Sequence, residues 1–267
     1  MFKKYGFVGI ILIIFAQVNF FLKIEPFQSW YVPIIWWGYI LTVDAIVFKI
    51  KGESLISNKF KQFIGIVALS VPIWAVFEFY NIFIQNWHYI NFSLIVHLVN
   101  FTIILPAVLE TYQLLKSTHL FDKIKLKKKH NISKRLITIM ITLGIFSLVL
   151  PFIFPKYTFP LVWLSFFLLL DPINYLNKRP SIISHLKDKK LIIPLSLFFG
   201  AIICGFFWEF WNFWAFPKWF YTIPFLGSFK IFEMPILGYI GYGPFGWQLY
   251  AMYNFLVGIF SKKTKID

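Results

Sequence analysis

Trp208-Glu209-Phe210-Trp211-Asn212 places a carboxylate and a carboxamide three residues apart inside an aromatic, otherwise apolar run. A looser copy, Phe77-Glu78-Phe79-Tyr80-Asn81, lies in the first half of the chain. On a helix, positions i and i+3 share a face, so each acid projects together with its asparagine among large rings. The two copies suggest that the chain arose by duplication, and the residues around them test that idea.

The composition of the whole chain is that of an integral membrane protein. Its 267 residues have a mean hydropathy of +0.71 and only 14% are charged, too few for a soluble globule of this length. A spanning helix takes roughly 20 mainly apolar residues. Eight runs qualify, at about 6–23, 31–49, 62–84, 91–115, 136–154, 158–176, 191–215 and 234–260. We therefore predict an all-α polytopic bundle of about eight transmembrane helices.

The positive charges mark the topology of this bundle. The net charge of +15 falls in short clusters at the N-terminus, in every second connection, including Lys127-Lys128-Lys129, and in the tail. By the positive-inside rule, this alternation predicts a protein of the cell membrane with both termini cytoplasmic. Clusters of this kind contact membrane lipid, and they argue against nucleic acid as a partner. The single cysteine, Cys204, excludes a cysteine-rich metal site, and we expect neither a metal nor another cofactor.

Matches between the two halves extend outward from the paired acids and keep their order. The matched positions are Trp36 with Trp163, Asp44 with Asp171 and Ser54 with Ser181 at an offset of 127 residues, Glu78 with Glu209 and Asn81 with Asn212 at 131, Trp87 with Trp219 and Tyr89 with Tyr221 at 132, and Glu110 with Gln248 at 138. The offset only grows, as insertions in the second copy would require. We predict two parallel four-span repeats, residues 1–125 and 126–267.

Acidic residues in the predicted spans fall into two layers. The outer layer holds Glu78, Glu209 and Glu233 with the aromatic residues Trp74, Tyr80, Trp208, Trp211, Trp214 and Trp219. The second polar layer, nearer the cytoplasmic ends, holds Asp44, Asp171, Glu110 and Gln248. An ionised acid near the bilayer centre costs about 2.5–3.5 kcal/mol on the insertion scale, and no Lys or Arg lies deep in a span to pair with it. We therefore expect the acids to face the bundle interior.

An acid embedded among aromatic rings suits proton transfer to an apolar substrate. A carboxylic acid can protonate a carbon–carbon double bond, and aromatic faces stabilise the carbocation that forms. This hypothesis makes Glu209 and Glu78 the catalytic acids, with Asn212 and Asn81 orienting them, Glu233 nearby, and the aromatic residues of the outer layer binding substrate. The same acids would serve a small-solute or proton-coupled transporter. A non-catalytic scaffold would use them as hydrogen bonds between helices.

The order of residues also resembles that of a known family. Val71-Pro72-Ile73-Trp74, Glu78, Trp87-x-Tyr89, and Pro106 with Glu110 resemble the repeat unit of the membrane-bound lycopene cyclases of the heterodimeric or fused type. The second copy has the same order through Trp208-Glu209, Trp219-x-Tyr221 and Glu233-Met234-Pro235. The resemblance implies duplicated helical units and, for an enzyme, a cyclase or isomerase of carotenoid biosynthesis acting on a carotenoid or related isoprenoid.

Overall fold

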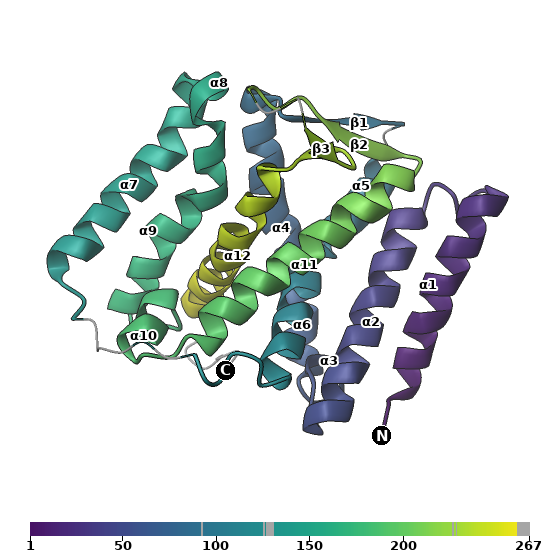
Figure 1. Ribbon diagram of the computed structural model, residues 1–267, viewed down its shortest axis with the longest axis horizontal. Helices are drawn as coiled ribbons and strands as arrows, with labels where there is room; N and C mark the ends of the chain where they lie inside the picture. Colours follow the sequence, from purple (N-terminus) through teal and green to yellow (C-terminus); the bar gives the residue numbers. More distant parts are fainter. Residues whose placement is uncertain (92, 125, 127–130, 226, 228, 261–267) are drawn as a thin grey trace.

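The computed structural model describes residues 1–91, 93–124, 126, 131–225, 227 and 229–260 (Figure 1). The helices are α1 Lys4–Leu22, α2 Tyr31–Lys51, α3 Leu55–Asn58, α4 Phe60–Ile84, α5 Leu94–Phe101, α6 Ile104–Ser117, α7 Lys134–Ile153, α8 Pro155–Thr158, the 3-10 helix η1 Phe159–Leu161, α9 Val162–Leu176, α10 Ile182–Lys187, α11 Ile192–Trp214 and α12 Gly238–Phe260. The strands are β1 Trp87–Ile90, β2 Lys218–Tyr221, β3 Lys230–Ile231 and β4 Met234–Pro235. The lysine run 127–129 and the tail lysines lie outside the described residues. The all-α polytopic bundle is confirmed.

Seven helical segments in the described part of the chain are long and apolar enough to cross a membrane. Two of them are interrupted: α5 and α6 together cover Leu94–Ser117, and α8, η1 and α9 cover Pro155–Leu176. Pro106 explains the first interruption, because its ring lacks an N–H donor and clashes with the carbonyl four residues earlier. The chain therefore breaks at residues 102–103 and restarts with the proline in the first turn of α6.

The last predicted span, 234–260, starts later than expected. Met234 and Pro235 pair with β3 in a short hairpin, and the helix begins only at Gly238. Helix α12 has 23 residues, but its glycines and the polar Gln248 and Asn254 leave it outside the seven apolar segments. It packs between α9 and α11, so little of its surface has to be apolar. It runs from the β3–β4 hairpin toward the end of the bundle where α1 begins (Figure 1).

The helices of the two halves pack in matching pairs. In the first half α1 packs on α2, and α6 packs on both α2 and α4. In the second half α7 packs on α9, and α12 packs on both α9 and α11. Across the halves, α6 contacts α11 and α4 contacts α12. In Figure 1, α1 and α7 lie at opposite outer edges. These matched contacts support the proposal that the bundle consists of two parallel four-helix repeats.

The strands β1 and β2, one from each half, form an antiparallel ribbon at the end of the bundle opposite the chain termini (Figure 1). The register pairs Trp87 with Tyr221, His88 with Phe220, and Tyr89 with Trp219. The sequence comparison matched Trp87 with Trp219 and Tyr89 with Tyr221. In the ribbon the pairing is crossed: Trp87 lies opposite Tyr221, and Tyr89 lies opposite Trp219. A local two-fold axis between His88 and Phe220 produces this reciprocal pairing.

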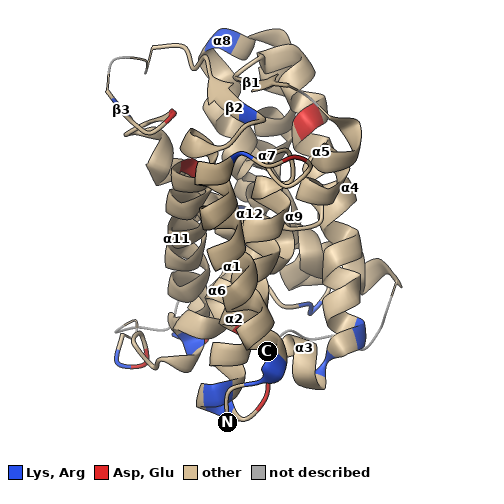
Figure 2. Cartoon of the chain, turned by 90° about the vertical axis from the view of Figure 1, so that its right-hand side faces the viewer, with Lys and Arg blue, Asp and Glu red and all other residues tan. Residues whose placement is uncertain are grey.

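The surface of the bundle fits a bilayer. The outer helices expose large apolar side chains, such as Ile11 on α1, 63% exposed, and Phe146 on α7, 56% exposed. Lys and Arg residues lie mostly at the end that carries the chain termini, with a few at the opposite end (Figure 2). The protein is therefore an integral membrane protein. That the basic end faces the cytoplasm of the cell membrane stays a prediction.

Candidate active site

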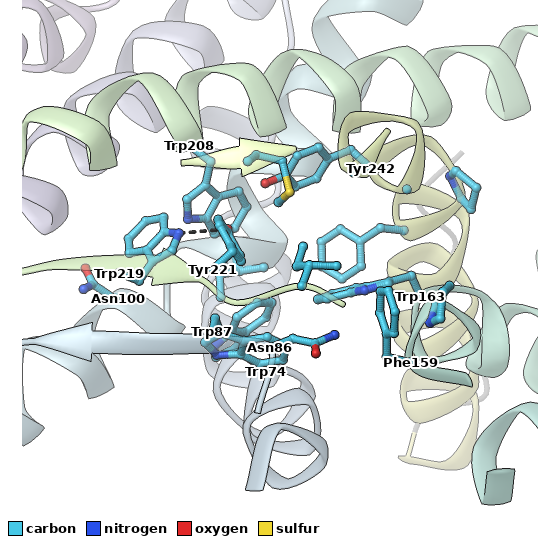
Figure 3. Close-up of a pocket in the computed structure, with 18 of the residues that line it drawn as sticks. Trp74, Asn86, Trp87, Asn100, Phe159, Trp163, Trp208, Trp219, Tyr221 and Tyr242 are labelled. Carbon is cyan, nitrogen blue, oxygen red and sulfur yellow. Dashed lines mark hydrogen bonds between the residues drawn. The ribbon is translucent and has the colours of Figure 1, made fainter. Parts of the chain in front are cut away.

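A cavity of about 400 Å³ lies beside the β1–β2 ribbon, and both halves of the bundle contribute to its wall. Figure 3 shows how the side chains from α4, α11, α12 and the two strands surround it. Six tryptophans and three tyrosines give the wall its character: Trp36, Trp74, Trp87, Trp163, Trp208, Trp219, Tyr89, Tyr221 and Tyr242. A mostly apolar cavity of this size with a few polar groups is typical of a small-molecule site.

Glu209 lies directly behind this wall. The side chain, on α11, is 0% exposed. Its Oε1 accepts hydrogen bonds from the hydroxyl groups of Tyr221, at 2.7 Å, and Tyr242, at 2.6 Å. Its Oε2 has no hydrogen-bond partner among the described residues. Both tyrosines line the cavity and Glu209 does not, so two phenol groups connect the carboxylate to the cavity.

Glu78 holds the corresponding position on α4 and is half-buried. Its Oε1 accepts hydrogen bonds from the indole nitrogens of Trp74, at 2.8 Å, and Trp87, at 3.3 Å, and from the hydroxyl group of Tyr89. All three donors line the same cavity. The two predicted acids therefore converge on one site, each through aromatic donors.

The tyrosines of the ribbon keep their protons at neutral pH. Burial, and then the nearby Glu78 carboxylate, raise the pKa of Tyr89 above its ordinary value. Burial and the Glu209 carboxylate act in the same way and raise the pKa of Tyr221 well above its ordinary value. Loss of the proton would leave a charged phenolate in a poorly solvated place. Both residues are therefore neutral phenols that donate to the acids.

The two asparagines hold the ribbon and make no hydrogen bond to the acids. Asn212 donates from Nδ2 to the Trp219 carbonyl, at 2.7 Å, and accepts from the Trp219 N–H, at 2.9 Å. Asn81 donates to the Trp87 carbonyl, at 2.7 Å, and accepts from the Trp87 N–H, at 3.2 Å. The sequence predicted that each asparagine orients its acid directly. The observed bonds instead run from each asparagine to the backbone of a tryptophan in the ribbon. Each asparagine fixes the strand that carries the tyrosine.

The other predicted outer-layer residues divide into two groups. Trp74, Trp208 and Trp219 line the cavity. Tyr80, Trp211, Trp214 and Glu233 lie elsewhere: Tyr80 bonds the Leu148 carbonyl, Trp211 packs on Trp36, Trp214 is 48% exposed, and Glu233 pairs with Lys218 at 2.6 Å. Tyr80 and Trp211 each follow their acid by two positions. Residues two apart on a helix point to opposite sides, so neither can face the site that its acid faces.

The two aspartates of the second polar layer cap short helices. Asp44 accepts from the Ile56 N–H, at 3.0 Å, and from the Ser54 hydroxyl group, at 2.7 Å. Asp171 accepts from the N–H groups of Ile182, at 2.7 Å, and Ile183, at 3.0 Å. These bonds satisfy N–H donors at the first turns of α3 and α10, which have no partner within the helix.

Gln248 and Glu110, matched in the sequence, are both fully buried. The Gln248 amide inserts into the backbone of α9, accepting from the Phe166 N–H at 2.9 Å and donating to the Val162 carbonyl at 3.1 Å. Glu110 lies in α6 beside Asp44. None of the four residues of this layer lines the aromatic cavity, and the hydrogen bonds of Asp44, Asp171 and Gln248 hold backbone segments.

Three lining residues show what the sequence did and did not signal. Trp36 and Trp163 were matched across the halves, and both line the cavity, so the duplication marked them without assigning them a role. Tyr242 has no match in the first half.

Comparison of the chain with family models, curated proteins and solved structures finds no match in any of the three. The geometry of the cavity is therefore the main indication of a function.

Proposed function

We propose that the protein is a membrane enzyme that binds an apolar, unsaturated isoprenoid in the aromatic cavity and isomerises or cyclises it by proton transfer. The observation that carries this proposal is the convergence of two acid–tyrosine pairs, Glu78 with Tyr89 and Glu209 with Tyr221, on one cavity with tryptophan walls. The resemblance of the repeat to that of the lycopene cyclases suggests the same substrate class.

The second pair is the better candidate for the chemical step. In the structure the Tyr221 hydroxyl group donates to Glu209. For the chemical step this bond reverses: protonated Glu209 donates to the Tyr221 oxygen, while the Tyr221 hydroxyl turns and gives its proton to a carbon of the substrate double bond. The carbocation that results lies among indole and phenol rings, whose faces stabilise positive charge. A proton lost from a neighbouring carbon then returns through Tyr242 to the carboxylate. The substrate gains and loses one proton, so the product is an isomer of the substrate.

The walls of the cavity favour this reaction over hydrolysis. A carbocation survives only where water is scarce, and the six tryptophans leave little polar surface beside Glu209. The polar side chains in the lining, such as Asn86 and Asn100, come from the β1 and α5 side of the cavity. The two amides therefore come from the first half of the chain, whereas Glu209 lies on α11 of the second half.

The proposal can be tested in a bacterial host that accumulates lycopene. The full chain should convert lycopene into a pigment of the same mass with a different absorption spectrum, detected by chromatography and mass spectrometry. Glu209→Gln and Tyr221→Phe should abolish the new pigment. Tyr80→Phe, which removes a phenol group outside the cavity, should keep it. An unchanged pigment composition, with the protein folded in the membrane, would overturn the carotenoid proposal.

A further inference from the structure

A second cavity, of about 530 Å³, lies between the loop that joins α1 to α2 and the end of α11. It shares no lining residue with the candidate active site. Its polar lining residues are Asn19, Lys23, Gln28 and Lys218, and most of the remainder is aromatic. A combination of amide and ammonium donors with aromatic rings differs from the nearly apolar wall of the first cavity, and it indicates a ligand with a polar group.

The charge of this cavity is positive. Lys23 and Lys218 line it, and no Asp or Glu occurs among its described lining residues. Lys218 is neutralised, because its Nζ lies 2.6 Å from Oε1 of Glu233. Lys23 forms no ion pair with any residue that the structure describes. The cavity therefore has one ammonium group whose charge is not compensated within the described chain.

Asn19 is the independent sign of a ligand. Its side chain lines the cavity although the residue is only 3% exposed, and its Nδ2 has no hydrogen-bond partner among the described residues. A buried amide donor without an acceptor is unfavourable, so such groups normally meet an oxygen of the protein, of water or of a ligand. The backbone places this donor close to Lys23, because the Lys23 N–H donates to the Asn19 carbonyl at 2.7 Å.

We propose that this cavity binds a phosphate group, with Lys23 as its counter-ion and Asn19 as a hydrogen-bond donor. The favoured source is the headgroup of an anionic lipid. Phe213, Trp214 and Phe216 line the cavity and are 36%, 48% and 49% exposed, so they extend its wall onto the surface of the bundle. Aromatic rings at this depth lie where headgroups meet acyl chains. The site is independent of the proposed catalysis.

Native mass spectrometry of the full chain in neutral detergent tests the proposal. The protein is titrated with phosphatidylglycerol, and separately with phosphatidylcholine, whose headgroup has no net charge. Lys23→Gln should weaken phosphatidylglycerol binding about fivefold, the effect of one lysine at a membrane surface. Lys23→Arg should restore it. Lys156→Gln is the matched control, since Lys156 is exposed at the same end of the bundle and lines neither cavity.

The outcomes separate the two sources of phosphate. Loss of phosphatidylglycerol binding in Lys23→Gln but not in Lys156→Gln, with no competition from inorganic phosphate, supports a lipid headgroup. Competition by inorganic phosphate that also depends on Lys23 supports a free phosphate ion in the same site. Equal binding of phosphatidylglycerol and phosphatidylcholine, or equal effects of the two lysine variants, would overturn the proposal.

Discussion

The two acid sites share one frame. Each acid lies on a long helix, accepts a hydrogen bond from a tyrosine of the ribbon, and is followed three positions later by an asparagine that holds the ribbon. They differ in burial, because Glu209 is 0% exposed and Glu78 is only half-buried. They differ also in the other donors to the carboxylate, which are two indoles at Glu78 and one phenol at Glu209, and that difference has consequences for chemistry.

Besides Tyr89, Glu78 accepts from the indoles of Trp87 and Trp74, and Trp74 lies one turn earlier on the same helix. At the offset of 131 residues that joins the two acids, its match is Gly205. A Cβ atom at Gly205 would lie 2.3 Å from a ring carbon of Tyr242, so the missing side chain makes room for that ring. An indole from the same helix is replaced by a phenol from α12. An indole N–H only donates, whereas a phenol both donates and accepts, so only Glu209 has two groups that can relay a proton.

The largest expected effect contrasts the two acids directly. Glu209→Gln should lower the rate of product formation by about 10²- to 10⁴-fold, the usual contribution of a general acid. Glu78→Gln should have a much smaller effect, because only one of its three donors, the Tyr89 hydroxyl group, can relay a proton. The measurement is pigment conversion per amount of folded protein in the membrane. Equal losses in the two variants would show that the acids act as a pair and would remove the distinction drawn from Gly205.

The second prediction tests the space that Gly205 provides. Gly205→Ala should destabilise the protein by about 2–3 kcal/mol, because the added methyl group overlaps the Tyr242 ring inside a packed interface. Gly65→Ala on α4 is the control, since a Cβ there meets no atom within 4 Å. In a helix interior that change should instead stabilise by about 0.5–1 kcal/mol. Thermal unfolding in detergent measures both, and an unaffected Gly205→Ala variant would contradict the assigned role.

The third prediction compares the asparagines. Asn81→Ala should cost about 2 kcal/mol and Asn212→Ala about 1 kcal/mol, because each leaves a tryptophan backbone N–H and carbonyl unpaired. The first cost is larger since Trp87 is buried and Trp219 is partly open to water, which can replace the lost bonds. Thermal unfolding again provides the measurement. The reverse order of the two costs would show that burial of the strand does not decide them.

These sites were partly visible in the sequence. Span length and hydropathy predicted the bundle, because a bilayer requires long apolar helices. The duplicated Glu-x-x-Asn pairs marked both acids, and the duplicated Trp-x-Tyr marked both ribbon tyrosines. The hydrogen-bond partner of each asparagine was not predictable. The chain folds back past the end of the helix, and the backbone of the following strand bonds the asparagine side chain. Tyr242 was not predictable either, since its place depends on how α12 packs against Gly205.

The smallest expected effect is a pH dependence that the two halves share. Burial raises the pKa of Tyr89 and of Tyr221, so the folded protein holds these protons more tightly than the unfolded chain does. The stability from each phenol is complete below the unfolded pKa of about 10 and is lost as pH rises above it. At pH about 10, where half of the unfolded phenol is ionised, each tyrosine should cost about 0.4 kcal/mol. Unfolding midpoints of the wild type against Tyr221→Phe and Tyr89→Phe, between about pH 8 and pH 10.5, measure this term. Each variant should lose less stability over that range than the wild type. If the stability of Tyr221→Phe fell with pH as steeply as that of the wild type, while that of Tyr89→Phe fell less steeply, the hydroxyl group of Tyr221 in the wild type would be solvated. The two acid sites would then differ in their ribbon tyrosines as well.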